Sequence, residues 1–478
     1  MTTLLFFDDQ RLDLMRNVRL GVGQPELIKE SVYQDPDINP HFGYPTVFFD
    51  EPSGKWRMLY QGRNQTKEGV REPDPKLIAE SDDGLAWYPL DTSSDIDLED
   101  RHHVHQLLPR ESHGQWNAYL DVKAPPSERF KGLVGKRGEG FHRGMESNAT
   151  LLVSPDGINW NERESVWHPS PPDPLTSVFW NEVRQSYVIT TRPEGGDRRI
   201  AFIETKDWKT YSEPELVMQT DSLDAHLTQI YGMPVIPYEG YYVGFVWLFH
   251  CVPEPSTKYL GGHMDCQLAY SLNGWHFQRG LRTPFIPNGR PGEPDSGTVY
   301  PTCVIPKDNG DLWIYASACT LEHGNVLKGD TGTLIAYRLR KDGFTYVEST
   351  GGNGVIGTRT LYWNEGELSL NVQAQGGDVR VQVTDSPSRS GIFTTPPNAI
   401  PGYSFDDCIP FSGDNIDWRP TWKDGKTLDA LSGKAIRIEI KLNSSRLYAI
   451  RGDFVYMLGQ QKRLFDKDGT VPVERPGF

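Results

Sequence analysis

Short apolar stretches recur along the chain, separated by Gly, Pro, Asp and Asn. Their β-branched and aromatic residues are typical of strands, and almost no stretch has the 3.6-residue periodicity of an amphipathic helix. The longest apolar run, residues 241–249, has nine residues, whereas a membrane-spanning helix requires ~20. The pattern therefore predicts an all-β protein with no membrane partner.

A seven-residue signature follows several of the predicted strands. It consists of Ser or Thr, any residue, Asp or Asn, Gly, two further residues and an aromatic residue. The copies, of which the last is degenerate, are residues 81–87, 154–160, 205–211, 271–277 and 338–344. Asp-Gly supplies left-handed turn positions, and the hydroxyl can bond the turn amides. Each copy thus predicts a hairpin whose aromatic residue packs between sheets.

A second repeated segment precedes each signature and reads as an apolar strand, a turn and an aromatic-rich strand. These segments are residues 46–60, 118–134, 177–190, 234–247 and 302–315. Together the two patterns describe a meander of four strands that occurs five times. This organisation predicts a five-bladed β-propeller over residues 1–350. A β-sandwich with coincidentally similar turns is the alternative.

The pattern changes after residue 358. Alternating strands continue, as in residues 368–372, 379–383, 435–442 and 446–450, but the turn signature is missing. Several short strands within about 120 residues are typical of a sandwich. We therefore expect a C-terminal β-sandwich domain over residues 358–478.

Length and charge narrow the class of partner. A chain of 478 residues is long enough for two domains with sizeable cores. The 49 Lys and Arg residues against 64 Asp and Glu residues give a net charge of −15, which argues against a nucleic-acid partner. The first residues lack a basic segment followed by a long apolar one, so we expect a cytoplasmic protein.

The topology of a propeller predicts where the chemistry lies. Ligands bind where the loops that precede each first strand meet the loops between the second and third strands. The carboxyl groups on these loops that are candidates for catalysis are Asp37, Asp173, Asp295, Asp265 and Glu146. The candidates for substrate binding are His41, Arg192, Asp224, His226, Gln229, His250, Glu293 and His323.

Several carboxylates, few lysines and nearby Trp, Tyr and His residues are typical of glycoside chemistry. Hydrolysis of a glycoside needs one carboxyl that protonates the leaving oxygen and one that attacks carbon or activates water. We expect Asp37 or Asp173 to be the nucleophile or base. The acid is then expected to be Asp295, Asp265 or Glu146.

Five strings of the sequence carry a resemblance to a known group of enzymes. They are residues 4–10, 230–240, 265–271, 295–301 and 402–410. The chain resembles the five-bladed propeller glycoside hydrolases related to families 32, 43 and 68, and most of all a bacterial branch called family 32 N-terminal-like. The resemblance implies a propeller that carries the active site, a C-terminal sandwich and activity on furanosides or other glycans. The WMNDPNG and RDP motifs of invertase-type enzymes do not occur in this chain.

The sequence thus predicts a glycoside hydrolase that removes a terminal sugar, furanosidic or otherwise, from a short oligosaccharide. Two alternatives remain open. A non-catalytic carbohydrate-binding propeller would lack a close pair of carboxyl groups. A transglycosylase or phosphorylase could use the same fold, and a phosphorylase should carry a basic cluster, for which Arg192, Arg198 and Arg199 are the local hint.

The sequence indicates no cofactor and no metal site. The histidines most suggestive of metal binding, His102, His103 and His105, follow an acidic stretch. However, no carboxylate stands at a recognised ligand spacing from them.

Overall fold

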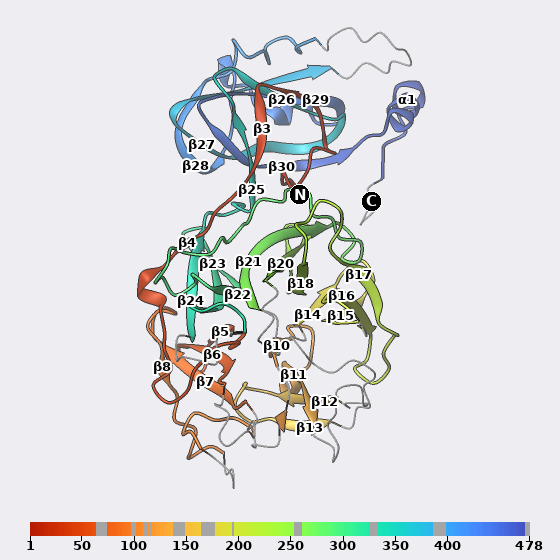
Figure 1. Cartoon of the computed structure of the whole chain (residues 1–478). Coiled ribbons are helices and arrows are strands. Elements are labelled where there is room, and N and C mark those ends of the chain that lie inside the picture. The colour runs from red at the N-terminus through yellow and green to blue at the C-terminus, as the bar shows by residue number, and fades with distance from the viewer. Residues whose placement is uncertain are drawn as a thin grey trace. The chain divides into compact units, whose positions relative to one another are not determined.

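The computed structural model describes most of the chain in two compact units. The described residues are 1–63, 74–96, 102–108, 112–113, 116–136, 149–163, 177–193, 196–252, 261–324, 332–385 and 398–473. The larger unit comprises residues 25–339, and the smaller unit combines residues 1–24 with residues 340–478 (Figure 1). Both are built from strands, as the sequence predicts.

Three sheets of the larger unit each contain one repeat of the predicted strand pattern, with antiparallel neighbours. The first repeat has β5 (Thr46–Asp50), β6 (Lys55–Gln61), β7 (Lys76–Ser81) and β8 (Tyr88–Pro89). The second has β10 (Tyr119–Leu120), β11 (Phe130–Lys136), β12 (Ala149–Ser154) and β13 (Asn161–Arg163), with β9 (Ser112–His113) beside β11. The third has β14 (Ser177–Asn181), β15 (Ser186–Thr191), β16 (Ile200–Thr205) and β17 (Glu215–Met218).

The last two repeats share one eight-stranded sheet. The fourth has β18 (Thr228–Gly232), β19 (Val235–Tyr238), β20 (Tyr241–Val252) and β21 (Gly261–Ser271). The fifth has β22 (Thr298–Pro306), β23 (Leu312–Cys319) and β24 (Gly332–Leu339), and β4 (Glu26–Leu27) pairs with β24. A parallel contact between Met264 and Thr298 joins the two repeats. Within the described residues of this unit, the 3-10 helices are Lys29–Ser31 and Pro126–Glu128.

The predicted signature turns are confirmed in the first four repeats, and all four use the same hydrogen bonds. In the fourth repeat, Ser271 Oγ accepts a bond from Gly274 N–H (2.9 Å), and Asn273 Oδ1 accepts bonds from the N–H groups of Trp275 and His276 (both 2.9 Å). The matching hydroxyls belong to Ser81, Ser154 and Thr205. The fourth turn residue has a positive φ in every case, including Trp208 at 58° in place of Gly. Local turn chemistry therefore explains why one end of each repeat has the same geometry.

Buried apolar clusters lie between successive repeats. Phe48 of β5 packs on Phe130 of β11, with ring centroids 4.6 Å apart. The signature aromatics join these clusters: Trp87 meets Tyr315, and Trp275 meets Phe202. Each repeat thus buries both faces against its neighbours, which accounts for its apolar runs.

The smaller unit contains a nine-stranded, nearly closed barrel-like sheet. Its strands are β1 (Thr2–Leu4), β2 (Leu12–Arg16), β3 (Val18–Val22), β25 (Thr345–Ser349), β26 (Gly354–Thr358), β27 (Leu361–Asp385), β28 (Phe411–Trp418), β29 (Lys434–Asn443) and β30 (Arg446–Tyr456). Two 3-10 helices, Lys423–Gly425 and Leu428–Leu431, and the helix α1 (Gly459–Asp468) complete it. Among the residues that the structure describes, no helix is long and apolar enough to cross a membrane.

The first 24 residues belong to this smaller unit, whereas the repeat pattern predicts that they belong to the propeller of residues 1–350. β1 pairs with β30, β2 with β26, and β3 with β25. Leu4, Phe6 and Leu12 are buried in the same core as β27 and β29. The pairing partners are more than 300 residues away in the chain, so the local repeat pattern contains no information about them.

We expect Ser271→Ala to lower the free energy of unfolding by about 1–2 kcal/mol, because it leaves the buried Gly274 N–H without an acceptor. Ser94→Ala, at an exposed serine, is the matched control. Thermal or urea unfolding followed by fluorescence measures the difference. Equal stability of the two variants would contradict a structural role for the signature hydroxyl.

Candidate active site

Five aromatic side chains from three repeats of the larger unit pack together. Phe42 and Tyr44 come from the segment before β5, Tyr231 from β18, Trp247 from β20 and Tyr300 from β22. Tyr44 stacks on Trp247 at 5.4 Å, and Trp247 meets Tyr300 edge-on at 5.2 Å. All five are at most 5% exposed. We call them the central aromatic cluster.

Three arginines lie over this cluster. The Arg63 guanidinium is 4.9 Å from the ring centre of Phe42, and those of Arg192 and Arg198 are each 5.4 Å from that of Tyr231. They follow β6 and β15, at the end of the repeats opposite the signature turns. Arg198 also donates to Gln229 Oε1 at 2.9 Å. The predicted residues Arg192 and Gln229 therefore come together at β18. Arg198 is predicted only as part of the basic cluster expected of a phosphorylase, and Arg63 is not among the predicted residues.

Two predicted histidines also contact the central aromatic cluster. The His41 ring is fully buried, 3.9 Å from Phe42, and neither ring nitrogen has a hydrogen-bond partner within the described part of the chain. Burial, followed by the charges of Arg63 and His323, holds the pKa of His41 well below its usual range. The His323 ring lies 5.3 Å from Tyr231. We call the group formed by His41, Arg63, Arg192, Arg198 and His323 the rim.

A carboxylate–histidine cluster joins the loop that leads to the rim with His105 and with Tyr60 of β6. Asp35 Oδ2 accepts hydrogen bonds from His105 Nε2 (2.9 Å) and from the Tyr60 hydroxyl. Burial acts to raise the pKa of Asp35, but the bonds from His105 and Tyr60 outweigh it and the pKa is lowered. Asp37 Oδ2 lies 3.9 Å from His105 Nδ1, and the Asp37 side chain is 49% exposed. The predicted Asp37 is thus an accessible carboxylate beside a buried histidine.

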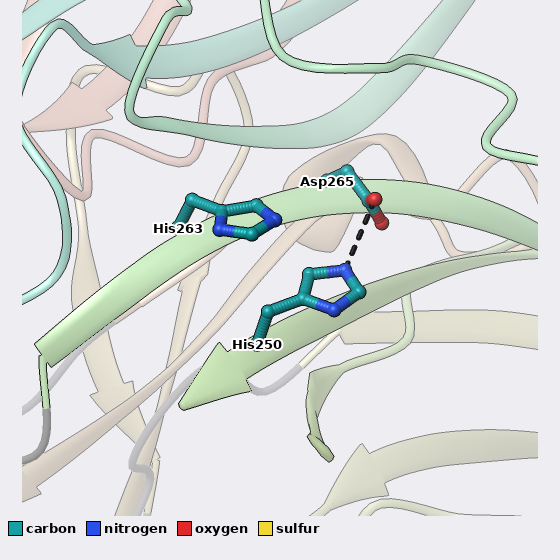
Figure 2. A group of neighbouring side chains, drawn as sticks. All are labelled: His250, His263 and Asp265. Carbon is teal, nitrogen blue, oxygen red and sulfur yellow. Dashed lines mark hydrogen bonds and ion pairs between the residues drawn. The ribbon is translucent and has the colours of Figure 1, made fainter. Parts of the chain in front are cut away.

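A second cluster joins two strands of the fourth repeat (Figure 2). His250 Nε2 is 3.0 Å from Asp265 Oδ2, and the rings of His250 and His263 stack with centroids 4.4 Å apart. Burial, together with the charge of His250, lowers the pKa of His263. The predicted set includes His250 and Asp265 but not His263. The signal available in the sequence is the spacing of two between His263 and Asp265, which places both on one face of a strand.

Asp295 lies on the predicted loop before β22 but is only 4% exposed. The Tyr337 hydroxyl donates to its Oδ2 at 2.5 Å. Burial raises the pKa of Asp295, and the bond from Tyr337 offsets this only in part. Its predicted neighbour Glu293 is exposed and accepts a bond from the Arg290 N–H at 2.7 Å.

Asp224 is engaged by arginines. Arg279 donates to both of its carboxylate oxygens (2.7 and 2.8 Å), and Arg282 adds a third contact. This pairing is typical of a structural ion pair. His226, two residues on, is exposed. The remaining predicted residues, Asp173 and Glu146, lie outside the described residues.

No protein-family model matches the chain, and neither does any curated protein. Solved structures do resemble it. A glycoside hydrolase is 16% identical, with a TM-score of 0.47, and the match covers 66% of this chain and 92% of the other. A glycosyl hydrolase from Bacteroides ovatus is 11% identical (TM-score 0.44; 67% and 94% covered). An N-acetylgalactosamine deacetylase from F. plautii, solved with blood group B trisaccharide, is 15% identical (TM-score 0.44; 68% and 95% covered).

The ion pair of Asp224 predicts a pH dependence of stability. Burial acts to raise the pKa of Asp224, but the hydrogen bond from Arg279 and the other contacts outweigh it and lower the pKa. A carboxyl with a lowered folded pKa stabilises the protein above its unfolded pKa of about 3.9, and this contribution is lost as the pH falls through the folded pKa. We therefore expect Asp224→Asn to melt below wild type at pH 5–7.

That difference in melting temperature should shrink below about pH 4, because the carboxylate becomes protonated first in the unfolded chain and then, at lower pH, in the folded protein. Glu213→Gln, at an exposed carboxyl, is the control and should match wild type throughout. Differential scanning fluorimetry across this pH range measures the effect. A difference that stays constant down to pH 3, or that is absent at pH 7, would contradict the assignment.

Proposed function

We propose that the chain is a glycoside hydrolase that removes a terminal sugar from a short oligosaccharide. In this proposal the five repeats are the blades of a five-bladed β-propeller, with a β-sandwich in the C-terminal part of the chain. The five strand groups, four of them with equivalent turns, support the propeller. The active site is then at the rim, where the loops that vary between the repeats meet.

The observation that carries the proposal is the placement of Asp37. This exposed carboxylate is held by a turn in which Asp35 Oδ1 accepts the Asp37 N–H (2.9 Å). The loop continues directly into the rim, because the Asn39 carbonyl accepts the Arg63 N–H (2.8 Å) and Asn39 Oδ1 accepts the His41 N–H (2.9 Å). An accessible carboxylate with a rigid support is what a nucleophile or general base requires.

The reaction needs a second carboxyl that remains protonated long enough to donate to the leaving oxygen. Asp295, Asp265 and Glu146 are the proposed sources. Asp295 has the raised pKa that suits an acid, although its burial means that the substrate must reach it through a local rearrangement. His41, Arg192, Gln229, His250 and His323 are proposed to bind sugar hydroxyls, since imidazole, guanidinium and amide groups all hydrogen-bond to them. His41 is fully buried, so, as with Asp295, a local rearrangement must expose it.

We expect Asp37→Asn to lower kcat/KM at least 100-fold while the melting temperature stays unchanged, because the amide keeps the shape of the side chain but cannot act as nucleophile or base. Asp308→Asn, at an exposed aspartate after β22, is the control. The assay uses nitrophenyl furanosides and pyranosides together with natural oligosaccharides. Full activity of Asp37→Asn would remove Asp37 from the reaction, and a wild type that cleaves no glycoside would contradict the hydrolase proposal.

One observation favours a second candidate, a phosphorylase. The guanidinium groups of Arg63, Arg192 and Arg198 converge on Phe42 and Tyr231, and arginine binds phosphate through two parallel hydrogen bonds. Running the same assay with and without inorganic phosphate separates the two reactions. A hydrolase releases free sugar in both buffers, whereas a phosphorylase needs phosphate and releases a sugar phosphate.

A further inference from the structure

The second cluster has the composition of a metal site. His250 near the end of β20 and His263 near the start of β21 are direct partners across the two strands. Asp265 stands two residues after His263, so its side chain emerges on the same face. One ring nitrogen from each histidine and one carboxylate oxygen all lie within 4.8 Å of one another. Figure 2 shows the three side chains turned toward the same space between the strands.

We propose that His250, His263 and Asp265 bind one divalent transition-metal ion. The inference does not depend on the proposed glycoside hydrolysis, because it rests on the donor atoms alone. A metal-bound Asp265 carboxylate holds no proton to donate, so the catalytic acid of that reaction is then Asp295 or Glu146. Two imidazoles and one carboxylate form the facial set of three ligands that such ions favour, whereas Ca²⁺ and Mg²⁺ prefer sites made of oxygen atoms. Zn²⁺ and Co²⁺ are therefore the appropriate probes.

The hydrogen bond between His250 and Asp265 does not account for the whole cluster. Asp265 is 7% exposed, and its Oδ1 has no hydrogen-bond partner among the residues that the structure describes. Nor does the bond explain why a second imidazole stacks on His250 at an angle of 14°. A cation bound by the carboxylate and both rings would give the buried Asp265 carboxylate a partner, since each group contributes a lone pair to the ion. Because imidazole lone pairs lie in the ring plane, the stacked rings turn to aim their nitrogens at the ion.

One side of the cluster faces solvent. The His263 side chain is exposed and that of His250 is 27% exposed, whereas Asp265 is buried behind them. Metal–nitrogen distances of about 2.0–2.1 Å require the donor atoms to close by roughly an ångström, which side-chain rotation can supply. Three protein ligands with an open side leave positions for water or a substrate oxygen, as in catalytic rather than structural sites.

The first cluster is a weaker candidate for the same role. Asp35, Asp37 and His105 also bring three donor atoms together. However, Asp35 Oδ2 already accepts bonds from both Tyr60 and His105, and the set contains only one imidazole. The arrangement is explained by hydrogen bonding, and we assign no metal to it.

The test is metal binding to the purified full-length chain after removal of metals with EDTA. We expect wild type to bind one Zn²⁺ per chain in a calorimetric titration, and Co²⁺ to give visible absorption bands. His263→Ala and Asp265→Asn should each weaken binding at least about 10-fold. His276→Ala is the matched control, because this exposed histidine bonds to Asn273 outside the cluster.

Thermal melts separate a loss of metal binding from a loss of folding, and they require no catalytic activity. His263 is exposed, so His263→Ala should melt like wild type without metal, while Zn²⁺ should raise the melting temperature of wild type and of His276→Ala only. A wild type that binds no Zn²⁺ or Co²⁺ at micromolar concentrations would overturn the proposal. Equal binding by wild type, His263→Ala and Asp265→Asn would overturn it as well. Failure of the glycosidase assay would leave the metal site intact.

Discussion

The packing of the central aromatic cluster is the constraint on which the rest of the larger unit depends. Phe42, Tyr44, Tyr231, Trp247 and Tyr300 come from the first, fourth and fifth repeats and fill the space between them. Because these rings exclude water and offer little hydrogen bonding, polar groups on the same segments are displaced to the rim. Arginines over ring faces gain cation–π stabilisation without losing contact with solvent.

The two ends of each repeat serve different purposes. At one end, a hydroxyl and a carboxylate or amide satisfy the turn amides, so the hairpins of four repeats have equivalent bonds. At the other end, the loops differ in length and composition, and each contributes different polar side chains. Rigid turns at one end thus allow variable chemistry at the other. The two carboxylate–histidine clusters, one on the loop before β5 and one on β20 and β21, belong to this variable chemistry.

Much of the strand organisation could be predicted from the sequence, because turn chemistry and apolar periodicity are local. The surroundings of the candidate site residues could be predicted only in part. Loop position led to Asp37, Arg192, Gln229, His250 and Asp265, whereas Asp35, His105 and Arg63 acquire their surroundings from distant segments; His105 is 70 residues from Asp35. Likewise, the burial of Asp295 behind Tyr337 depends on tertiary packing. The three-stranded contribution of residues 1–24 to the smaller unit has the same origin.

The most direct measurement is a crystal structure of the Asp37→Asn variant soaked with an oligosaccharide that wild type cleaves. We expect electron density for the sugar at the rim, with the scissile oxygen beside residue 37 and hydroxyls bonded to Arg192 or His323. Sugar bound at the signature-turn end, or to the smaller unit alone, would contradict a catalytic rim above the central aromatic cluster.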